Sequence, residues 1–129
     1  LDEACDIYCQ LSKFLDSNSC NEKFADALYN KARIIRIIDH DGYRTFEIDI
    51  IYNRAEDLYK ECCSYQKLAH CYAVHASFAE EIEEKNKALG LYQAAIDIYR
   101  ALYSETGNIQ YKNKHIEIEK RLNNLQLSK

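Results

Sequence analysis

A pattern of tyrosine, alanine and tyrosine recurs along this chain at an interval of forty residues. Tyr92, Ala95 and Tyr99 are spaced three and four apart, which places them on one face of a helix. The same frame, moved back by forty positions, gives Tyr52, Ala55 and Tyr59. A related copy opens the chain as Leu1, Ala4 and Tyr8. The chain is therefore predicted to consist of a repeated helical element.

The composition favours long helices over strands. The 129 residues include no proline, only three glycines and a single valine, so the residues that punctuate turns and build sheets are scarce. The apolar content of 47% is enough for a continuous core. We expect one all-α domain, residues 1–129, with about six helices.

Turn and capping residues place the first helix boundaries. A helix from about residue 2 to 15 should stop at the sequence DSNSCN, after which Ser19 or Asn21 can cap a second helix. The second helix carries an apolar stripe of Phe24, Leu28, Ile35 and Ile38, widened by Ala27 and Ile34. Gly42 allows the turn that ends this helix, and Thr45 is the predicted cap of the third.

The second half of the chain is less clearly divided. Ser64 marks a break, and a fourth helix should begin at about Tyr65. Analogy with the preceding repeat predicts a turn near Glu83, although no glycine or proline marks it, and one helix over residues 65–104 is the alternative. The fifth helix should stop at Gly107, and the sixth carries the stripe Tyr111, His115, Ile118, Leu122 and Leu125.

The charge balance and hydropathy exclude several classes of partner. A net charge of −4 argues against a nucleic-acid backbone, which requires a basic face. No apolar run approaches the length that spans a bilayer, and the first residues do not resemble a secretory signal. We expect a cytoplasmic protein that binds no membrane. Because the chain lacks methionine and begins inside a repeat, we also expect it to be a piece of a longer protein.

Cysteine and histidine side chains gather in one part of the chain, at Cys62, Cys63, His70, Cys71 and His75. Cys71 and His75 are four apart, as metal ligands on a helix can be, but the cysteines lack the CxxC spacing of structural zinc sites. Cysteine also serves as a small buried apolar residue. We therefore predict no metal site and no cofactor.

Catalytic motifs are missing from the sequence. It has neither a glycine-rich phosphate loop nor HExxH, and none of the histidines follows a glutamate by three positions as in di-iron bundles. A cysteine that lies close to a histidine in space remains an alternative as a nucleophile, but nothing in the sequence identifies such a pair. A non-enzymatic protein is the expectation, with a metal-binding or catalytic helical bundle as the third alternative.

The repeat resembles the tetratricopeptide family. Residues that match its second-helix signature are Gly90, Tyr92, Ala95, Ile96 and Tyr99, and those that look like its first-helix signature are Leu68, Ala69 and Tyr72. The resemblance covers two repeats, residues 24–63 and 64–103, a half repeat over residues 1–20 and a terminal helix over residues 104–129. The repeat is forty residues rather than about 34, and it lacks the proline and tryptophan of the family.

The resemblance implies antiparallel helical hairpins stacked as a right-handed α-α superhelix, with the first helix of each repeat facing a concave groove. Positions carried over to that groove are Asp26, Asn30, Arg33, Gln66 and His70. The implied function is a protein-interaction scaffold that binds a peptide or a partner helix there. The alternative is a regulatory or sensor segment of a multidomain signalling protein that packs on its neighbouring domain. The outer side of the last helix is a candidate surface for homo-oligomers.

Overall fold

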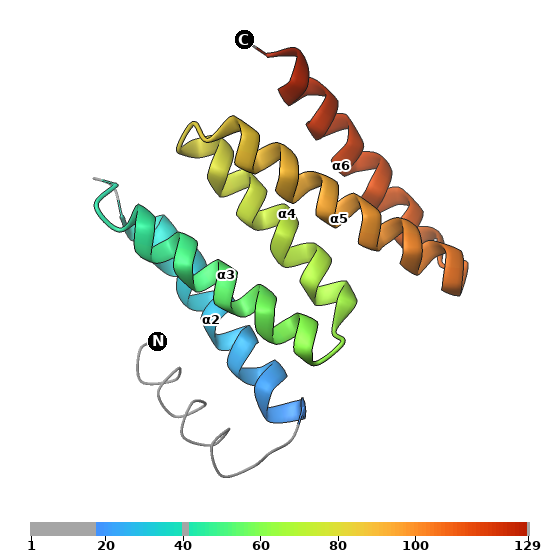
Figure 1. Ribbon diagram of the computed structural model, residues 1–129, viewed down its shortest axis with the longest axis horizontal. Coiled ribbons are helices and arrows are strands. Elements are labelled where there is room, and N and C mark those ends of the chain that lie inside the picture. The colour runs from blue at the N-terminus through green and yellow to red at the C-terminus, as the bar shows by residue number, and fades with distance from the viewer. Residues whose placement is uncertain (1–17, 40–41, 129) are drawn as a thin grey trace. The chain divides into compact units, whose positions relative to one another are not determined.

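The computed structural model describes residues 18–39 and 42–128 of the chain, with side chains from residue 21 onward. This part consists of α-helices and contains no strand, which confirms the all-α prediction. The helix bounds are α2 (Asn18–Ile38), α3 (Thr45–Glu61), α4 (Tyr65–Glu81), α5 (Lys85–Thr106) and α6 (Ile109–Leu127) (Figure 1). The helix predicted over residues 2–15 lies outside the described residues.

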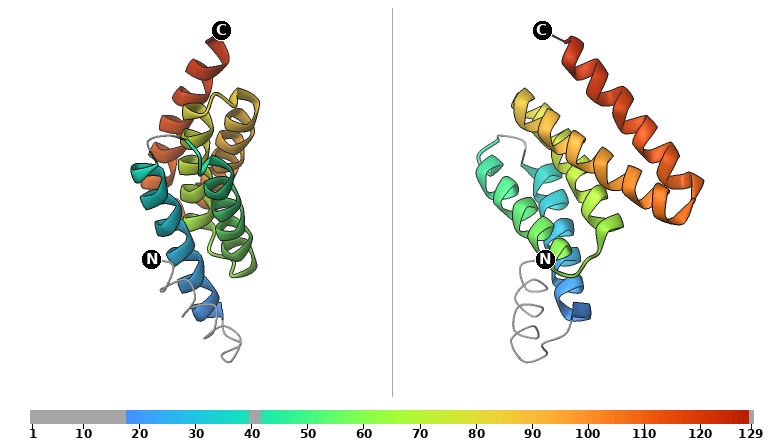
Figure 2. Two further views of the ribbon diagram at one scale, coloured as in Figure 1. Left: turned by 90° about the vertical axis from the view of Figure 1, so that its left-hand side faces the viewer. Right: turned by 45° about the vertical axis from the view of Figure 1, so that its right-hand side comes forward.

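The chain divides into two compact units, residues 1–64 and 65–129. In the first unit, α2 and α3 form an antiparallel hairpin (Figure 1). In the second unit, α5 packs against both α4 and α6 and runs antiparallel to each of them, so that α4 and α6 run in the same direction (Figures 1 and 2). None of the helices in the described ranges is both long enough and apolar enough to span a bilayer.

The core of the first unit follows the predicted stripes for most of their length. Phe24, Leu28 and Ile35 of α2 are buried, as are the apolar residues Ile48, Ile51, Tyr52, Ala55 and Tyr59 of α3. The prediction is wrong for the end of α2, where Ile34 and Ile38 are exposed by 41% and 58%. Ile34 and Ile38 are four apart on one side of α2, whereas the buried residues Leu28, Ala32 and Ile35 follow the neighbouring side.

Small side chains bring the helices of the second unit close together. Its core combines alanines with larger residues of α5 and α6, namely Ala69, Ala76, Ala79, Ala88, Tyr92, Ala95, Ile96, Tyr99, Ile118 and Leu122. Tyr92, Ala95 and Tyr99 are exposed by 3% or less, which confirms that this face is buried. Their equivalents forty positions earlier, in the first unit, are buried to the same degree.

Helices α4 and α5 are separate, so the alternative of one helix over residues 65–104 is wrong. The amide of Glu84 donates to the carbonyl of Ala79, and that of Glu83 donates to the carbonyl of Glu80. These two bonds form a Schellman motif, in which the residue after the cap is left-handed. Glu83 has a φ of 62°, which glycine would adopt more readily. The end of α3 repeats this geometry, with Cys63 at a φ of 57°.

The other helix ends agree with the sequence in part. Gly42 and Gly107 have φ values of 74° and 68°, and Gly107 caps α5 as predicted. Thr45 is the first residue of α3 and not its cap, because its hydroxyl donates to the carbonyl of Gly42 at 2.9 Å, away from the helix amides. Arg44 occupies the cap position, with no hydrogen bond from its side chain to a helix amide.

Candidate functional site

The groove residues that the sequence predicted on α2 differ in their surroundings. Asn30 and Arg33 are exposed, and the guanidinium carbon of Arg33 lies 5.7 Å from the ring centroid of Tyr29. Asp26 is half-buried, and its Oδ1 accepts a hydrogen bond from the hydroxyl of Tyr59 at 2.5 Å. The Asp26 carboxylate therefore also contributes to the contact between α2 and α3.

The predicted residues of α4 begin a stripe that extends along the whole helix. Gln66 and His70 are exposed, and Oε1 of Gln66 accepts a hydrogen bond from the hydroxyl of Tyr111 on α6 at 3.2 Å. Residues 73, 77 and 80 continue the same face at helical spacing. This face ends in a polar cleft at the C-terminal end of α4.

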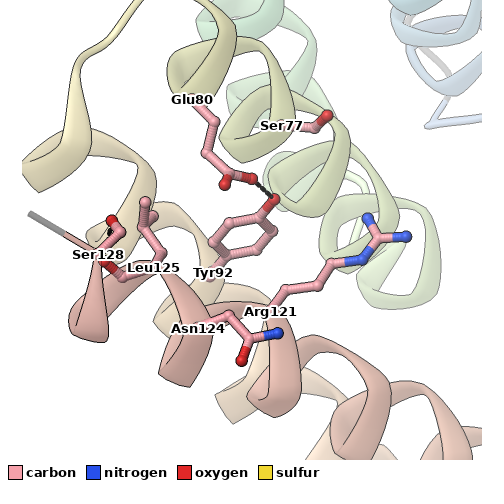
Figure 3. A pocket seen from close by; sticks show the side chains of 7 residues that line it. All are labelled: Ser77, Glu80, Tyr92, Arg121, Asn124, Leu125 and Ser128. Atoms are coloured by element: carbon pink, nitrogen blue, oxygen red, sulfur yellow. Dashed lines mark hydrogen bonds between the residues drawn. The ribbon is translucent and has the colours of Figure 1, made fainter.

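The cleft has a volume of about 370 Å³ and is formed by all three helices of the second unit (Figure 3). Helix α4 supplies Ser77 and Glu80, and α5 supplies Tyr92. The remaining lining residues belong to α6 and the residue after it, namely Arg121, Asn124, Leu125 and Ser128. The cleft thus combines a carboxylate, a guanidinium, an amide and hydroxyls around one apolar side chain.

A hydrogen bond between helices fixes the acidic group of the cleft. The hydroxyl of Tyr92 donates to Oε2 of Glu80, and the two side chains point toward one another across α4 and α5 (Figure 3). Burial of the phenol raises the pKa of Tyr92, as do its hydrogen bond to Glu80 and the negative charge of that carboxylate, while Arg121 has a smaller opposing effect. Tyr92 is therefore a neutral donor that orients the Glu80 carboxylate.

The basic group of the cleft is partly neutralised on its own helix. A guanidinium nitrogen of Arg121 lies 3.5 Å from Oε1 of Glu117, one turn earlier on α6. Both side chains are more than half exposed, so this pair is weakly held. Arg121 therefore keeps the freedom to turn its donors toward a ligand.

The end of α6 forms the rim of the cleft. The backbone amide of Ser128 donates to the carbonyls of Asn124 and Leu125, and its hydroxyl donates to the carbonyl of Leu125 at 2.7 Å. Nζ of Lys85, at the start of α5, donates to the carbonyl of Ser128 at 2.5 Å. These bonds tie the C-terminal end of α6 to the turn between α4 and α5.

The sequence prediction named Gln66 and His70 on α4 and went no further along the cleft-lining part of this helix. Helical spacing from Gln66 and His70 leads directly to Ser77 and Glu80, so the signal for these two residues was present. Arg121 and Asn124 could not be found in this way. Which face of α6 turns toward α4 depends on how both helices pack on α5, and the sequence of α6 alone does not specify that packing.

The cysteines and histidines do not form a ligand cluster in the ranges 18–39 and 42–128, where no three metal-binding side chains converge. Cys63 is exposed, Cys62 is half-buried, and Cys71 and His75 are buried. Burial raises the pKa of the Cys62 thiol, and Glu22 and Glu61 raise it further. A thiol with a raised pKa is less often ionised and is a weaker nucleophile.

Two apolar surfaces lie outside the cleft. One surrounds the turn between α2 and α3, where Ile37, Tyr43 and Phe46 are exposed. The other is the side of α6 that carries Ile109 and Ile116, which are also exposed. Neither surface includes a residue that lines the cleft.

Comparison with known proteins gave no match. A scan against protein-family models, a search of curated proteins and a search of solved structures each found nothing similar to this chain.

Proposed function

We propose that this chain is a protein-interaction module built from tetratricopeptide-like hairpins in a superhelix, and that it holds an extended peptide in the cleft between α4 and α6. The observation that carries the proposal is the cleft itself, which continues the stripe of Gln66 and His70 along α4. The forty-residue register supports the repeat, because Tyr52 and Tyr92 occupy equivalent buried positions in the two compact units.

The chemistry of the lining suits a peptide backbone. The side chain of Asn124 carries both donors and an acceptor, so it can bond the N–H and C=O groups of a bound chain. The hydroxyl of Ser128 donates its proton to the carbonyl of Leu125, and its oxygen can accept a hydrogen bond. A volume of about 370 Å³ is at the small end of ligand sites, which matches a few side chains of a peptide laid across the cleft.

Peptide selection on the full chain tests this proposal. A random peptide library displayed on phage is selected on the immobilised protein, and the affinities of enriched peptides are measured by fluorescence polarisation. Asn124→Ala should weaken binding about fivefold, the loss expected for one net hydrogen bond of about 1 kcal/mol. Asn123→Ala is the matched control, because this neighbour is exposed and does not line the cleft.

Two results would remove the proposal. Selection that enriches no peptide would argue against a peptide-binding module, and an affinity unchanged by Asn124→Ala would place binding elsewhere. The peptide affinity of the Arg33→Glu variant then tests whether the predicted face of α2 contributes to binding. A loss of affinity in that variant would show that α2 also contacts the peptide, and an unchanged affinity would show that it does not.

A further inference from the structure

The accessible charge of the cleft is unequally distributed. The side chain of Glu80 is exposed, and its carboxylate can accept further hydrogen bonds besides the one from Tyr92. Arg121 has a second acid, Glu117, beside it at 3.5 Å, in an exposed and weak pair. A ligand that enters the cleft therefore meets an oriented carboxylate with spare acceptor capacity, and the guanidinium of the lining has an acid of its own helix beside it.

The ends of two helices add partial negative charge near the cleft. Helices α4 and α6 both end beside the cleft, at Glu81 and Leu127, and the C-terminal end of a helix carries a partial negative charge. The N-terminal end of α5 lies at the same rim, where its first residue, Lys85, is already bonded to the carbonyl of Ser128.

A positively charged side chain of the protein already binds at this rim of the cleft. The ammonium group of Lys85 binds the carbonyl of Ser128 immediately after the end of α6. A backbone carbonyl at this end thus already accepts a hydrogen bond from a positive group. The half-buried side chain of Leu125 lies beside it and offers an apolar surface for the methylene stem of a long basic side chain.

From these contacts we infer that the cleft selects peptides with a lysine or arginine, whose cationic group binds the Glu80 carboxylate. This inference rests on the proposed function and specifies the class of peptide. Tyr92 acts as a positioning residue, because its hydroxyl holds the Glu80 carboxylate and its ring is buried. Arg121 contributes a second contact, to a carbonyl or carboxylate of the same peptide.

The same phage library distinguishes this inference from the proposed function. Peptides selected on the natural chain should be enriched in lysine and arginine, and their affinity should fall about fivefold in Glu80→Gln, as expected for loss of an exposed ion pair. Glu81→Gln is the matched control, because Glu81 is the next residue on α4, is also exposed and lies outside the lining. Circular dichroism confirms that each variant is folded.

Charge reversal gives a second measurement. Selection on Glu80→Lys should enrich aspartate and glutamate in place of basic residues. If no peptide is enriched on the natural chain, the proposed function itself is lost. If peptides are enriched without basic residues, or if Glu80→Gln binds the basic peptides unchanged, the preference for a cation is overturned and the peptide-binding cleft stands.

Discussion

The hydroxyl of Tyr59 on α3 donates a hydrogen bond to Oδ1 of Asp26 on α2, with 2.5 Å between the two oxygens. Forty positions after Asp26, the side chain of Gln66 accepts a hydrogen bond from the hydroxyl of Tyr111. A tyrosine hydroxyl therefore engages the equivalent first-helix position in each compact unit. The groove positions closest to the start of each repeat thus make structural contacts as well as being candidates for binding.

Tyr59→Phe should lower the free energy of unfolding by about 1–2 kcal/mol, because it removes a hydrogen bond to a half-buried carboxylate and leaves the ring in place. Urea unfolding of the full chain measures the change. Tyr43→Phe is the control, since Tyr43 is 88% exposed and should tolerate the loss of its hydroxyl. Equal stability of the two variants would show that the bond to Asp26 contributes nothing.

The sequence predicts the helices well because their apolar residues have a clear period. Its predictions fail at some helix ends, where a single hydrogen bond determines which residue is the cap. Thr45 was predicted as a cap from its residue type, but the turn that begins at Gly42 brings a carbonyl within 2.9 Å of its hydroxyl. The turn at Glu83 has no glycine, so only the repeat register indicated it. A left-handed glutamate is unfavourable locally, and the packing of the two helices it connects must offset that cost.

Glu83→Gly should therefore stabilise the protein by about 0.5–1 kcal/mol, because glycine adopts a positive φ without the steric cost of a side chain. Thermal unfolding followed by circular dichroism detects the gain. Glu83→Ala removes the same carboxylate but keeps a Cβ at this position, so it should not be stabilising. A gain in the alanine variant as large as in the glycine variant would trace the effect to charge instead.

The candidate site was only partly predictable for a related reason. The face of α4 follows from spacing, so Gln66 and His70 indicate the direction of the cleft. The cleft itself needs Tyr92 from α5 and Arg121 from α6, and only the packing of the three helices brings them into one lining with Glu80. Tyr92 was predicted to be buried, and it is, but its bond to Glu80 gives that buried side chain a role at the site.

Tyr92→Phe should change how stability depends on alkaline pH. The raised pKa of Tyr92 means that the folded protein keeps a proton that the unfolded chain releases. Its contribution to stability is complete below the ordinary tyrosine pKa of about 10 and is lost as the pH rises through the folded-state pKa. The free energy of unfolding should therefore fall less between about pH 9 and about pH 11 in Tyr92→Phe than in the natural chain. Parallel slopes for both proteins would contradict this prediction.

Gly90→Ala should be stabilising by about 0.5–1 kcal/mol, because Gly90 is exposed inside α5 and an added Cβ meets no atom within 4 Å. Gly107→Ala provides a control of opposite sign, because Gly107 has a φ of 68° and an alanine there is strained. Thermal unfolding of both variants gives the comparison. A loss of stability in Gly90→Ala would mean that a neighbouring group packs closely against this position.

Ala95→Trp should destabilise the protein by about 3 kcal/mol or more, because Ala95 is fully buried among the helices of the second compact unit and a large ring cannot enter without moving them. Ala101→Trp is the matched control, since Ala101 is exposed on the same helix. Urea unfolding measures the stability of each variant, and tryptophan emission reports whether the new ring is buried or exposed to solvent. If Ala95→Trp is as stable as Ala101→Trp, the close approach of α4 and α5 at this alanine is wrong, and with it the packing that holds Tyr92 against Glu80.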